Sequence, residues 1–226
     1  MNNTPDINTK EYWDTRFEKN WELCGGREQS RFFARLVVDN LPSWFMDQLK
    51  SGHLTFLDWG CAQGDGTAIW TDFIDGGQIT GIDFSRTAIE KAARNYPDIC
   101  FINEDWLKDS EEKIKYHDIV FSSNTLEHFR NPYDVLNTLS LHAGKAIVLI
   151  LPFRETDRIE EHLYTFTDEN IPKSLQNGFR LFWSKVIDCR QIPGSLWHGE
   201  QIVLIYADEH WIDSLGIPVK KILEGK

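Results

Sequence analysis

Phe56-Leu57-Asp58-Trp59-Gly60-Cys61-Ala62-Gln63-Gly64-Asp65-Gly66-Thr67 is the stretch that decides the fold of this chain. The apolar run at residues 54–57 predicts a short buried strand, which ends at an acidic residue and a glycine-spaced turn. Apolar residues at helical spacing follow over residues 68–74. A strand, a glycine turn and a helix bring backbone N–H groups close to a ligand at the carboxyl end of an α/β sheet. Glycine suits such a turn because a side chain would hold the ligand away from the backbone.

The glycine spacing narrows the kind of ligand. Gly60-x-x-x-Gly64-x-Gly66 differs from the G-x-G-x-x-G of dinucleotide sites and from the G-x-x-x-x-G-K-[ST] of P-loops. No Gly-Lys-Ser or Gly-Lys-Thr sequence occurs in the chain. The sequence therefore offers no dedicated cradle for a pyrophosphate or a triphosphate, and a tight turn without any ligand is the alternative at this stage.

The composition is typical of a soluble globular protein with one domain. The chain has 226 residues and a formal net charge of −11. That charge does not attract phosphate backbones, so we expect no nucleic-acid partner. The longest apolar run, residues 146–151, is too short to cross a bilayer, and the polar first ten residues lack the apolar core of a signal peptide. The four scattered cysteines form no C-x-x-C pair, so we expect reduced thiols and a cytoplasmic protein. We also expect no membrane association, and a monomer or a homodimer.

Strands and helices alternate along the rest of the chain, which predicts a doubly wound α/β fold. Further strands are expected at residues 78–83, 99–103, 117–122, 145–151, 179–189 and 201–206. Helices are expected at residues 31–41, 86–95 and 133–141, with Ser85 and Asn131 as caps of the last two, and a short helix is expected between Thr167 or Asn170 and Gly178. We divide the single domain 1–226 into a helical cap (1–50), a core (51–207) and a tail (208–226).

Three consecutive strands end in residues that can contact a ligand. Asp83, at the end of the second strand, can accept hydrogen bonds from both ribose hydroxyls, which serves NAD and other adenosyl ligands alike. Asp105 and Trp106 follow the third strand, where a carboxylate can accept hydrogen bonds and an indole offers a flat face for stacking. Three ligand-competent strand ends at regular spacing are stronger support for a ligand site than any one of them.

The turn resembles the first motif of the Rossmann-like S-adenosylmethionine (SAM)-dependent methyltransferases, of the small-molecule type 11/23-like group. In that family an Asp precedes Gly-x-Gly-x-Gly, and Asp58, Gly60 and Gly64 match. Ala62 replaces the middle glycine. Leu126-Glu127-His128 is similar to the fourth motif of the small-molecule members. The resemblance implies a mostly parallel seven-stranded sheet with an antiparallel edge strand, helices on both faces and an N-terminal helical cap.

The resemblance also implies SAM as the cofactor and a set of residues that bind it. Tyr12 belongs to a Tyr-Trp pair that is typical of a cap over the cofactor, and Arg31 is the candidate for its carboxylate. The remaining cofactor-binding candidates lie at or after the strand ends: Asp58, Gly60, Gly64, Asp83, Phe84, Asp105, Trp106 and Asn124.

The implied reaction is methyl transfer to a nucleophile, with a small polar molecule as acceptor. The Asn/Asp-Pro-Pro-Tyr motif of enzymes that methylate amino groups is absent after the fourth strand, which favours O-methylation of a sugar, polysaccharide intermediate or natural product. A hydroxyl must lose its proton, so His162 and, second, His128 are the candidates for a general base. Ser122 and Ser123 replace the acids of metal-dependent catechol-type enzymes, so we expect no metal.

Two other function classes remain possible from the sequence. An NAD(P)-binding oxidoreductase could use a similar sheet, although the glycine spacing and the lack of a Tyr-x-x-x-Lys pair oppose it. A non-catalytic interaction module would keep the fold only. Asp58, Asp83 and Asp105 oppose that alternative, because carboxylates at neighbouring strand ends repel one another without a ligand.

Overall fold

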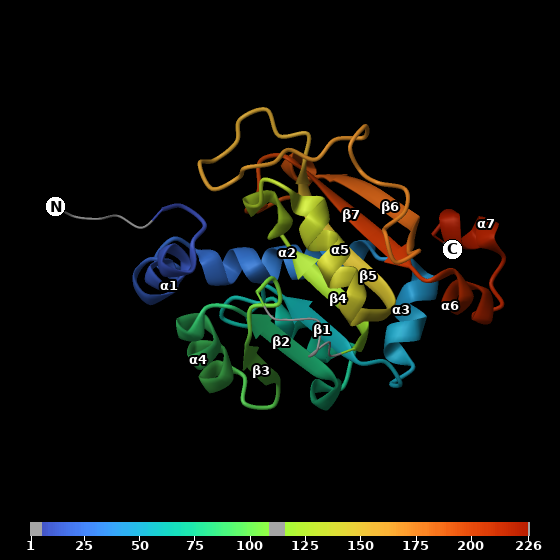
Figure 1. Cartoon of the computed structure of the whole chain (residues 1–226), viewed down its shortest axis with the longest axis horizontal. Helices are drawn as coiled ribbons and strands as arrows, with labels where there is room; N and C mark the ends of the chain where they lie inside the picture. Colours follow the sequence, from blue (N-terminus) through green and yellow to red (C-terminus); the bar gives the residue numbers. More distant parts are fainter. Residues whose placement is uncertain (1–5, 109–115, 226) are drawn as a thin grey trace.

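Seven strands form one sheet in the order β3-β2-β1-β4-β5-β7-β6, as the computed structural model of the chain shows (Figure 1). The structure describes residues 6–108 and 116–225. The strands are β1 Phe56–Trp59, β2 Ile79–Asp83, β3 Cys100–Asn103, β4 His117–Ser123, β5 Ala143–Phe153, β6 Arg180–Asp188 and β7 Glu200–Ala207. Their positions agree with the expected strands to within about two residues at each end.

Six strands run in the same direction, and β7 runs against them. β1 pairs in parallel with both β2 and β4, and β4 pairs in parallel with β5. β7 is antiparallel to β5 and to β6, so it lies between them and β6 forms the outer edge. The predicted fold class, a mostly parallel seven-stranded sheet with antiparallel pairing at one edge, is confirmed.

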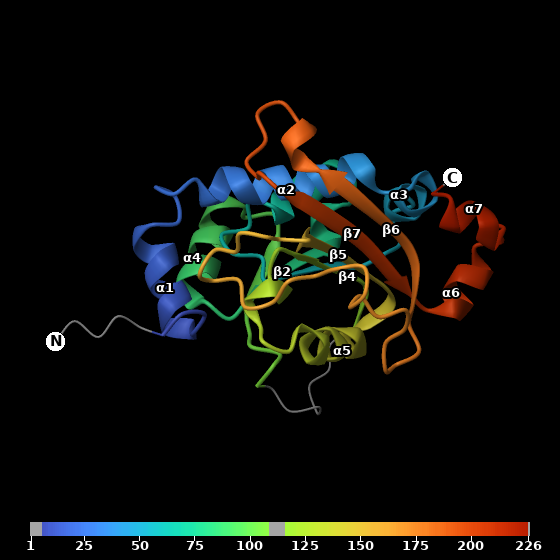
Figure 2. The same ribbon diagram turned by 90° about the horizontal axis from the view of Figure 1, so that it is seen from above.

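Helices cover both faces of the sheet (Figure 2). α2 and α3 lie over one face and α5 over the other, while α1 lies at the end of the molecule beside α4. The helices are α1 Lys10–Lys19, α2 Gly26–Asn40, α3 Ser43–Lys50, α4 Arg86–Asn95, α5 Pro132–His142, α6 Glu209–Ser214 and α7 Val219–Leu223. None of the helices over the described ranges is long and apolar enough to cross a membrane.

The central strand β5 explains why the sheet needs helices on both sides. Ala146, Val148 and Ile150 pack into the core beneath α2 and α3, whereas Ile147 and Leu149 pack into the core beneath α5. All five side chains are completely buried. A strand that is apolar on both faces is typical of the centre of a doubly wound sheet. The tail also packs on this body, because Ile212 of α6 and Ile222 of α7 are buried in the first of these cores.

Three local expectations differ from the structure. The segment after the glycine turn is a 3-10 helix, η1 Thr67–Asp72, rather than an α-helix. No helix forms over residues 167–178. The side chain of Asn170 instead accepts a hydrogen bond from the N–H of Thr167 and donates one to the carbonyl oxygen of Thr165. Asn131 precedes α5, but its side chain makes no capping hydrogen bond. Pro132 begins the helix, and because proline has no N–H, its nitrogen requires no hydrogen-bond acceptor.

Candidate active site

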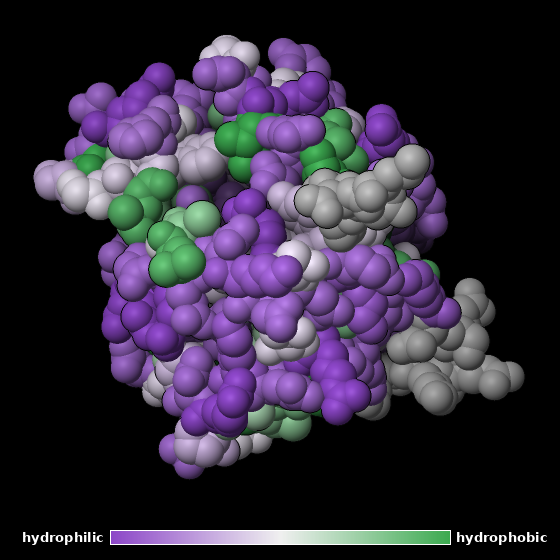
Figure 3. Space-filling view, turned by 90° about the vertical axis from the view of Figure 1, so that its left-hand side faces the viewer, coloured by the Kyte–Doolittle hydropathy of each residue, from purple (hydrophilic) through white to green (hydrophobic). Residues whose placement is uncertain are grey.

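A cavity of about 550 Å³ lies at the carboxyl ends of the parallel strands. Gly60, Asp83 and Asn124 line it from the ends of β1, β2 and β4, and Trp13 of α1 and Trp197 of the β6–β7 connection line it from other sides. Cavities of this size suit a cofactor or a small substrate. The outer face on the α1 side is mostly hydrophilic, and its hydrophobic side chains form small groups rather than one large patch (Figure 3).

The turn after β1 presents backbone rather than side chains to the cavity. Gly60 has a φ of +77°, and a Cβ at this position would lie 2.8 Å from Oγ1 of Thr125. Ala62 has a φ of +50°, in the left-handed region, at the position where the related motif carries glycine. The N–H groups of Gly60 and Cys61 donate to the carbonyl oxygen of Ile82, at 2.8 and 3.0 Å, so β2 holds the turn.

Asp83 places a buried carboxylate in the cavity wall. Its Oδ2 accepts from the N–H of Ala62 at 3.0 Å, and its Oδ1 accepts from the N–H of Ser85 at 2.8 Å. Burial raises the pKa of Asp83 to about 6, although these two hydrogen bonds oppose the rise. Each carboxylate oxygen keeps further acceptor capacity, so Asp83 can also accept from the hydroxyls of a ligand.

An acid and two aromatic side chains form the wall next to Asp83. Phe84, Asp105 and Trp106 all line the cavity. The indole of Trp106 is buried and stacks on the ring of His142, with their centroids 3.7 Å apart. Oδ2 of Asp105 lies 3.2 Å from Nζ of Lys108. This wall therefore offers flat apolar surface together with a hydrogen-bond acceptor.

Two residues of the glycine motif support the turn and do not line the cavity. Asp58 is buried in β1, and its Oδ2 accepts from the hydroxyl of Thr67 at 2.6 Å. Burial raises the pKa of Asp58 to about 7. Gly64 has a φ of +78°, and a Cβ there would lie 2.6 Å from the ring of Phe101. Both were expected at the cofactor; the structure places them behind the turn that carries Gly60.

Arg31 and Tyr12 also lie outside the cavity lining. Nη2 of Arg31 lies 2.8 Å from Oδ1 of Asp65, and its guanidinium also donates to the hydroxyl of Tyr96. The hydroxyl of Tyr12 donates to Oε1 of Glu161 at 2.7 Å. Arg31 therefore contacts the glycine turn, and Tyr12 contacts the loop after β5. Trp13, the neighbour of Tyr12 in α1, lines the cavity.

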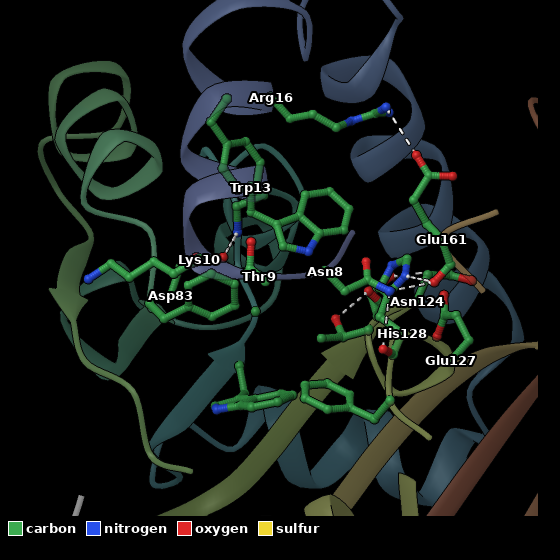
Figure 4. Close-up of a pocket in the computed structure, with 18 of the residues that line it drawn as sticks. Asn8, Thr9, Lys10, Trp13, Arg16, Asp83, Asn124, Glu127, His128 and Glu161 are labelled. Atoms are coloured by element: carbon green, nitrogen blue, oxygen red, sulfur yellow. Dashed lines mark hydrogen bonds and ion pairs between the residues drawn. The ribbon is translucent and has the colours of Figure 1, made fainter. Parts of the chain in front are cut away.

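Glu127, His128 and His162 gather on the side of the cavity opposite Asp83. Figure 4 shows Glu127 and His128 side by side there, with Asp83 across the cavity. Nδ1 of His128 lies 3.0 Å from the carbonyl oxygen of Glu161, and Nδ1 of His162 lies 2.8 Å from Oε1 of Glu155. A carbonyl and a carboxylate can only accept, so both Nδ1 atoms carry the hydrogen, and each neutral imidazole keeps a lone pair on Nε2.

The three groups of this cluster differ in their protonation. Burial raises the pKa of Glu127 to about 8 and lowers the pKa of His128 to about 4. Burial also opposes protonation of His162, but the hydrogen bond that His162 donates to Glu155 and the nearby acidic charges outweigh it and raise the pKa of His162. His128 is therefore neutral near pH 7, whereas His162 gains protons more readily than an ordinary histidine.

A family model described as a methyltransferase domain matches residues 57–144. Residues 57–144 are therefore similar to a methyltransferase domain. This stretch contains the glycine turn, Asp83 and the cluster residues Glu127 and His128, and its match together with the fold confirms the resemblance to the Rossmann-like SAM-dependent methyltransferases. No curated protein sequence matches the chain significantly.

Several solved structures share the fold of this chain. The magnesium protoporphyrin IX methyltransferase from Synechocystis PCC 6803, with bound SAH, has a TM-score of 0.65 at 15% identity and covers 88% of this chain and 97% of its own. The plantazolicin methyltransferase BpumL in complex with SAH has a TM-score of 0.54 at 15% identity, covering 88% and 95%. The [4+2]-cyclase SpnF has a TM-score of 0.54 at 15% identity, covering 73% and 80%, so the fold alone does not fix the reaction.

Two features of the cavity were not predicted from the sequence. Glu127 belongs to the Leu126-Glu127-His128 motif, but the sequence predicted no role for it, although it is completely buried beside the cavity. Arg16 of α1 was also missed; its Nη1 lies 3.1 Å from Oε1 of Glu161 and ties α1 to the loop after β5 (Figure 4). For the position of Glu127, the sequence offered only the adjacent His128 and the later His162 as a signal. Nothing in the sequence links Arg16 to Glu161.

Proposed function

We propose that the protein is a SAM-dependent methyltransferase that O-methylates a small polar acceptor, such as a sugar, a polysaccharide intermediate or a natural product. The observation that carries the proposal is one cavity with two chemically different sides. Asp83 lies on one side and the imidazole of His128 on the other, with the ring centroid of His162 5.3 Å from that of His128. One side suits a cofactor with ribose hydroxyls, and the other suits a hydroxyl that must lose a proton.

The residues of the cavity fit S-adenosylmethionine. Asp83 would accept from the ribose hydroxyls, and Asp105 would accept from the adenine amino group. Phe84 and Trp106 offer flat apolar surface for the adenine ring. Gly60 lets a ligand approach the backbone at a point where any Cβ would meet Thr125.

When bound, SAM supplies a methyl group on a sulfonium that is already an activated leaving group. The protein then has to hold the acceptor oxygen in line and exclude water, and positioning of this kind contributes about 7–11 kcal/mol in well-oriented reactions. Trp13 and Trp197 form apolar walls of the cavity, which suits the exclusion of water.

His162 is the first candidate to take the proton of the acceptor, and His128 the second. Glu155 holds Nδ1–H of His162, which leaves Nε2 as the acceptor and stabilises the protonated ring. This is the arrangement in which a carboxylate orients a histidine base. His128 is held in the same tautomer by the carbonyl oxygen of Glu161, but its low pKa makes it the weaker base.

The cysteines and the net charge support our expectations about the location of the protein and the class of its acceptor. We expect a cytoplasmic protein with reduced thiols, because Cys24, Cys61, Cys100 and Cys189 are all free. The net charge of −11 supports a small-molecule acceptor over a nucleic acid. A monomer or a homodimer suits a single domain of this size.

Calorimetric titration of S-adenosylhomocysteine tests the proposal. We expect micromolar binding to the wild type and at least tenfold weaker binding to Asp83→Ala, a change of about 1.4 kcal/mol. Asp72→Ala is the matched control, because Asp72 is an exposed acid that pairs only with Arg35 among the described residues. Folded wild-type protein that does not bind the ligand, or equal affinity in Asp83→Ala, would refute the cofactor site.

A further inference from the structure

Glu127 carries a buried carboxyl group in the lining of the cavity. Its side chain is completely inaccessible to solvent, and neither carboxylate oxygen has a hydrogen-bond partner among the described residues. The carbonyl oxygen of the same residue accepts from the N–H groups of Leu163 and Tyr164, at 2.8 and 3.1 Å, so the loop after β5 packs directly against it. A buried carboxylate costs several kcal/mol unless hydrogen bonds, a cation or protonation compensate for its burial.

Two imidazole nitrogens face this carboxylate. Nε2 of His162 lies 3.9 Å from Oε1 of Glu127. One ligand atom each from Glu127, His128 and His162 can be chosen so that all three lie within 4.8 Å of one another. A tetrahedral site with bonds of about 2.0–2.1 Å needs its ligand atoms roughly 3.4 Å apart, so side-chain movements of about 1 Å would close the set around an ion.

Groups around the cluster hold both imidazoles in the orientation that metal ligands need. The carboxylate of Glu155 holds Nδ1 of His162, and the carbonyl oxygen of Glu161 holds Nδ1 of His128. A histidine that binds a metal through one nitrogen almost always donates its other N–H to a carboxylate or a carbonyl. Both histidines of the cluster have this support, from two different acceptors.

We propose that Glu127, His128 and His162 bind a divalent transition-metal ion at the acceptor side of the cavity. Two imidazoles and one carboxylate suit Zn²⁺, Fe²⁺, Mn²⁺ or Co²⁺ better than Mg²⁺ or Ca²⁺, which prefer oxygen ligands. Three protein ligands leave at least one coordination position open, and all three residues line the cavity. The inference departs from the expectation drawn from Ser122 and Ser123, because the ligands come from the turn after β4 and from the loop after β5.

The ion has a specific consequence for the acceptor, and this part rests on the proposed function. An oxygen that occupies the open position becomes more acidic, since a divalent ion stabilises the deprotonated form. The acceptor is then a compound whose hydroxyl, alone or together with a neighbouring oxygen, can coordinate the ion. In that case the two histidines are ligands that activate the hydroxyl, and its proton leaves to solvent.

Titration of tag-free, chelator-treated protein with Zn²⁺ tests the site directly. We expect one ion per chain with micromolar or tighter affinity. Glu127→Gln and His162→Gln keep the size of the side chains closely, and each should weaken Zn²⁺ binding at least a hundredfold. His210→Ala, which removes an exposed histidine elsewhere, should leave the affinity unchanged. Circular dichroism of each variant establishes that it is folded.

Co²⁺ gives a second readout that does not depend on affinity. Visible absorption of the Co²⁺-loaded protein should show the intense bands of a four- or five-coordinate site with nitrogen ligands, and Glu127→Gln should lose them. Binding of S-adenosylhomocysteine should survive in Glu127→Gln, which separates this site from the cofactor site. Absence of Zn²⁺ binding by wild-type protein that binds S-adenosylhomocysteine, or equal Zn²⁺ affinity in Glu127→Gln, would overturn the metal site and leave the proposed function standing.

Discussion

Oδ2 of Asp83 accepts a hydrogen bond from the backbone N–H of Ala62, with the two atoms 3.0 Å apart. The end of β2 thereby fixes the turn that follows β1, and the same carboxylate also lines the cavity. Ala62 can donate to Asp83 because its backbone has a φ of +50°. The turn geometry and the candidate ribose site therefore depend on one another, and substitutions in the turn should change both stability and ligand affinity.

Ala62→Gly should stabilise the protein. A non-glycine residue in the left-handed region costs about 1–2 kcal/mol, while glycine makes the unfolded chain more flexible at a cost of about 0.4–1 kcal/mol. The expected net gain in the free energy of unfolding is up to about 1 kcal/mol. Urea denaturation measures it. A loss of stability would mean that the methyl group of Ala62 packs more favourably than its backbone conformation costs.

Gly60→Ala should weaken both the fold and ligand binding. It places a Cβ at a φ of +77° and 2.8 Å from Oγ1 of Thr125. Gly52→Ala is a matched control, since Gly52 has a φ of +76° but no atom within 4 Å of an added Cβ. Both variants should lose about 1–2 kcal/mol of stability from backbone strain, but only Gly60→Ala should bind S-adenosylhomocysteine at least tenfold more weakly. Equal affinities in the two variants would show that Gly60 is not needed at the ligand.

The residues at strand ends were predictable, because strand ends are local features of the sequence. Asp83 ends one predicted strand and Asn124 closely follows another, and parallel strands bring their ends together whatever the rest of the chain does. Arg31 was not predictable, because its partner Asp65 lies in the glycine turn and only the packing of α2 shows that they meet. The burial of Glu127 likewise depends on the loop after β5, which no local pattern places.

Arg31→Ala should leave the affinity for S-adenosylhomocysteine within about twofold of wild type. Arg31 pairs with the buried Asp65, and that carboxylate keeps Arg27 and Tyr96 as partners when Arg31 is lost. Because Arg31 is partly exposed, we expect a stability loss of only about 1 kcal/mol. Arg35→Ala, which removes an exposed pair with Asp72, is the control. A tenfold loss of affinity in Arg31→Ala would instead support contact with the carboxylate of the cofactor.

Asp58→Asn should change how stability depends on pH. Burial raises the pKa of Asp58 from 3.8 to about 7, so between these values the folded state binds more protons than the unfolded state. Stability from this group is therefore greatest at low pH and is lost as the pH rises toward 7. The wild type should lose roughly 2–3 kcal/mol relative to Asp58→Asn between pH 5 and pH 8.

Urea denaturation of both proteins at several pH values measures this difference, and the comparison cancels the titration of groups that do not interact with Asp58; Asp83, whose charge acts on Asp58, is not among them. The amide of asparagine can still accept from the hydroxyl of Thr67, so the variant keeps the hydrogen bond that Asp58 makes. A difference in unfolding free energy that is constant from pH 5 to pH 8 would show that Asp58 is ionised in the folded protein throughout this range.

Glu161→Gln should loosen α1 from the cavity. Oε1 of Glu161 accepts from the hydroxyl of Tyr12 at 2.7 Å and pairs with Nη1 of Arg16 at 3.1 Å, so one carboxylate holds two side chains of α1 (Figure 4). Removing its charge should speed amide hydrogen exchange over residues 10–19 several-fold, because charge-assisted hydrogen bonds are about twice as strong as neutral ones. The carbonyl oxygen of Glu161 still accepts from His128, so the histidine cluster should keep its geometry.

Hydrogen–deuterium exchange followed by mass spectrometry measures this effect, with Glu160→Gln, an exposed neighbour, as the control. If α1 closes the cavity over the ligand, S-adenosylhomocysteine should restore slow exchange in the wild type and in Glu160→Gln, and should do so only at higher concentration in Glu161→Gln. Unchanged exchange over α1 in Glu161→Gln would mean that the apolar packing of Phe17 with Ala62 and Ala88 holds this helix without the carboxylate.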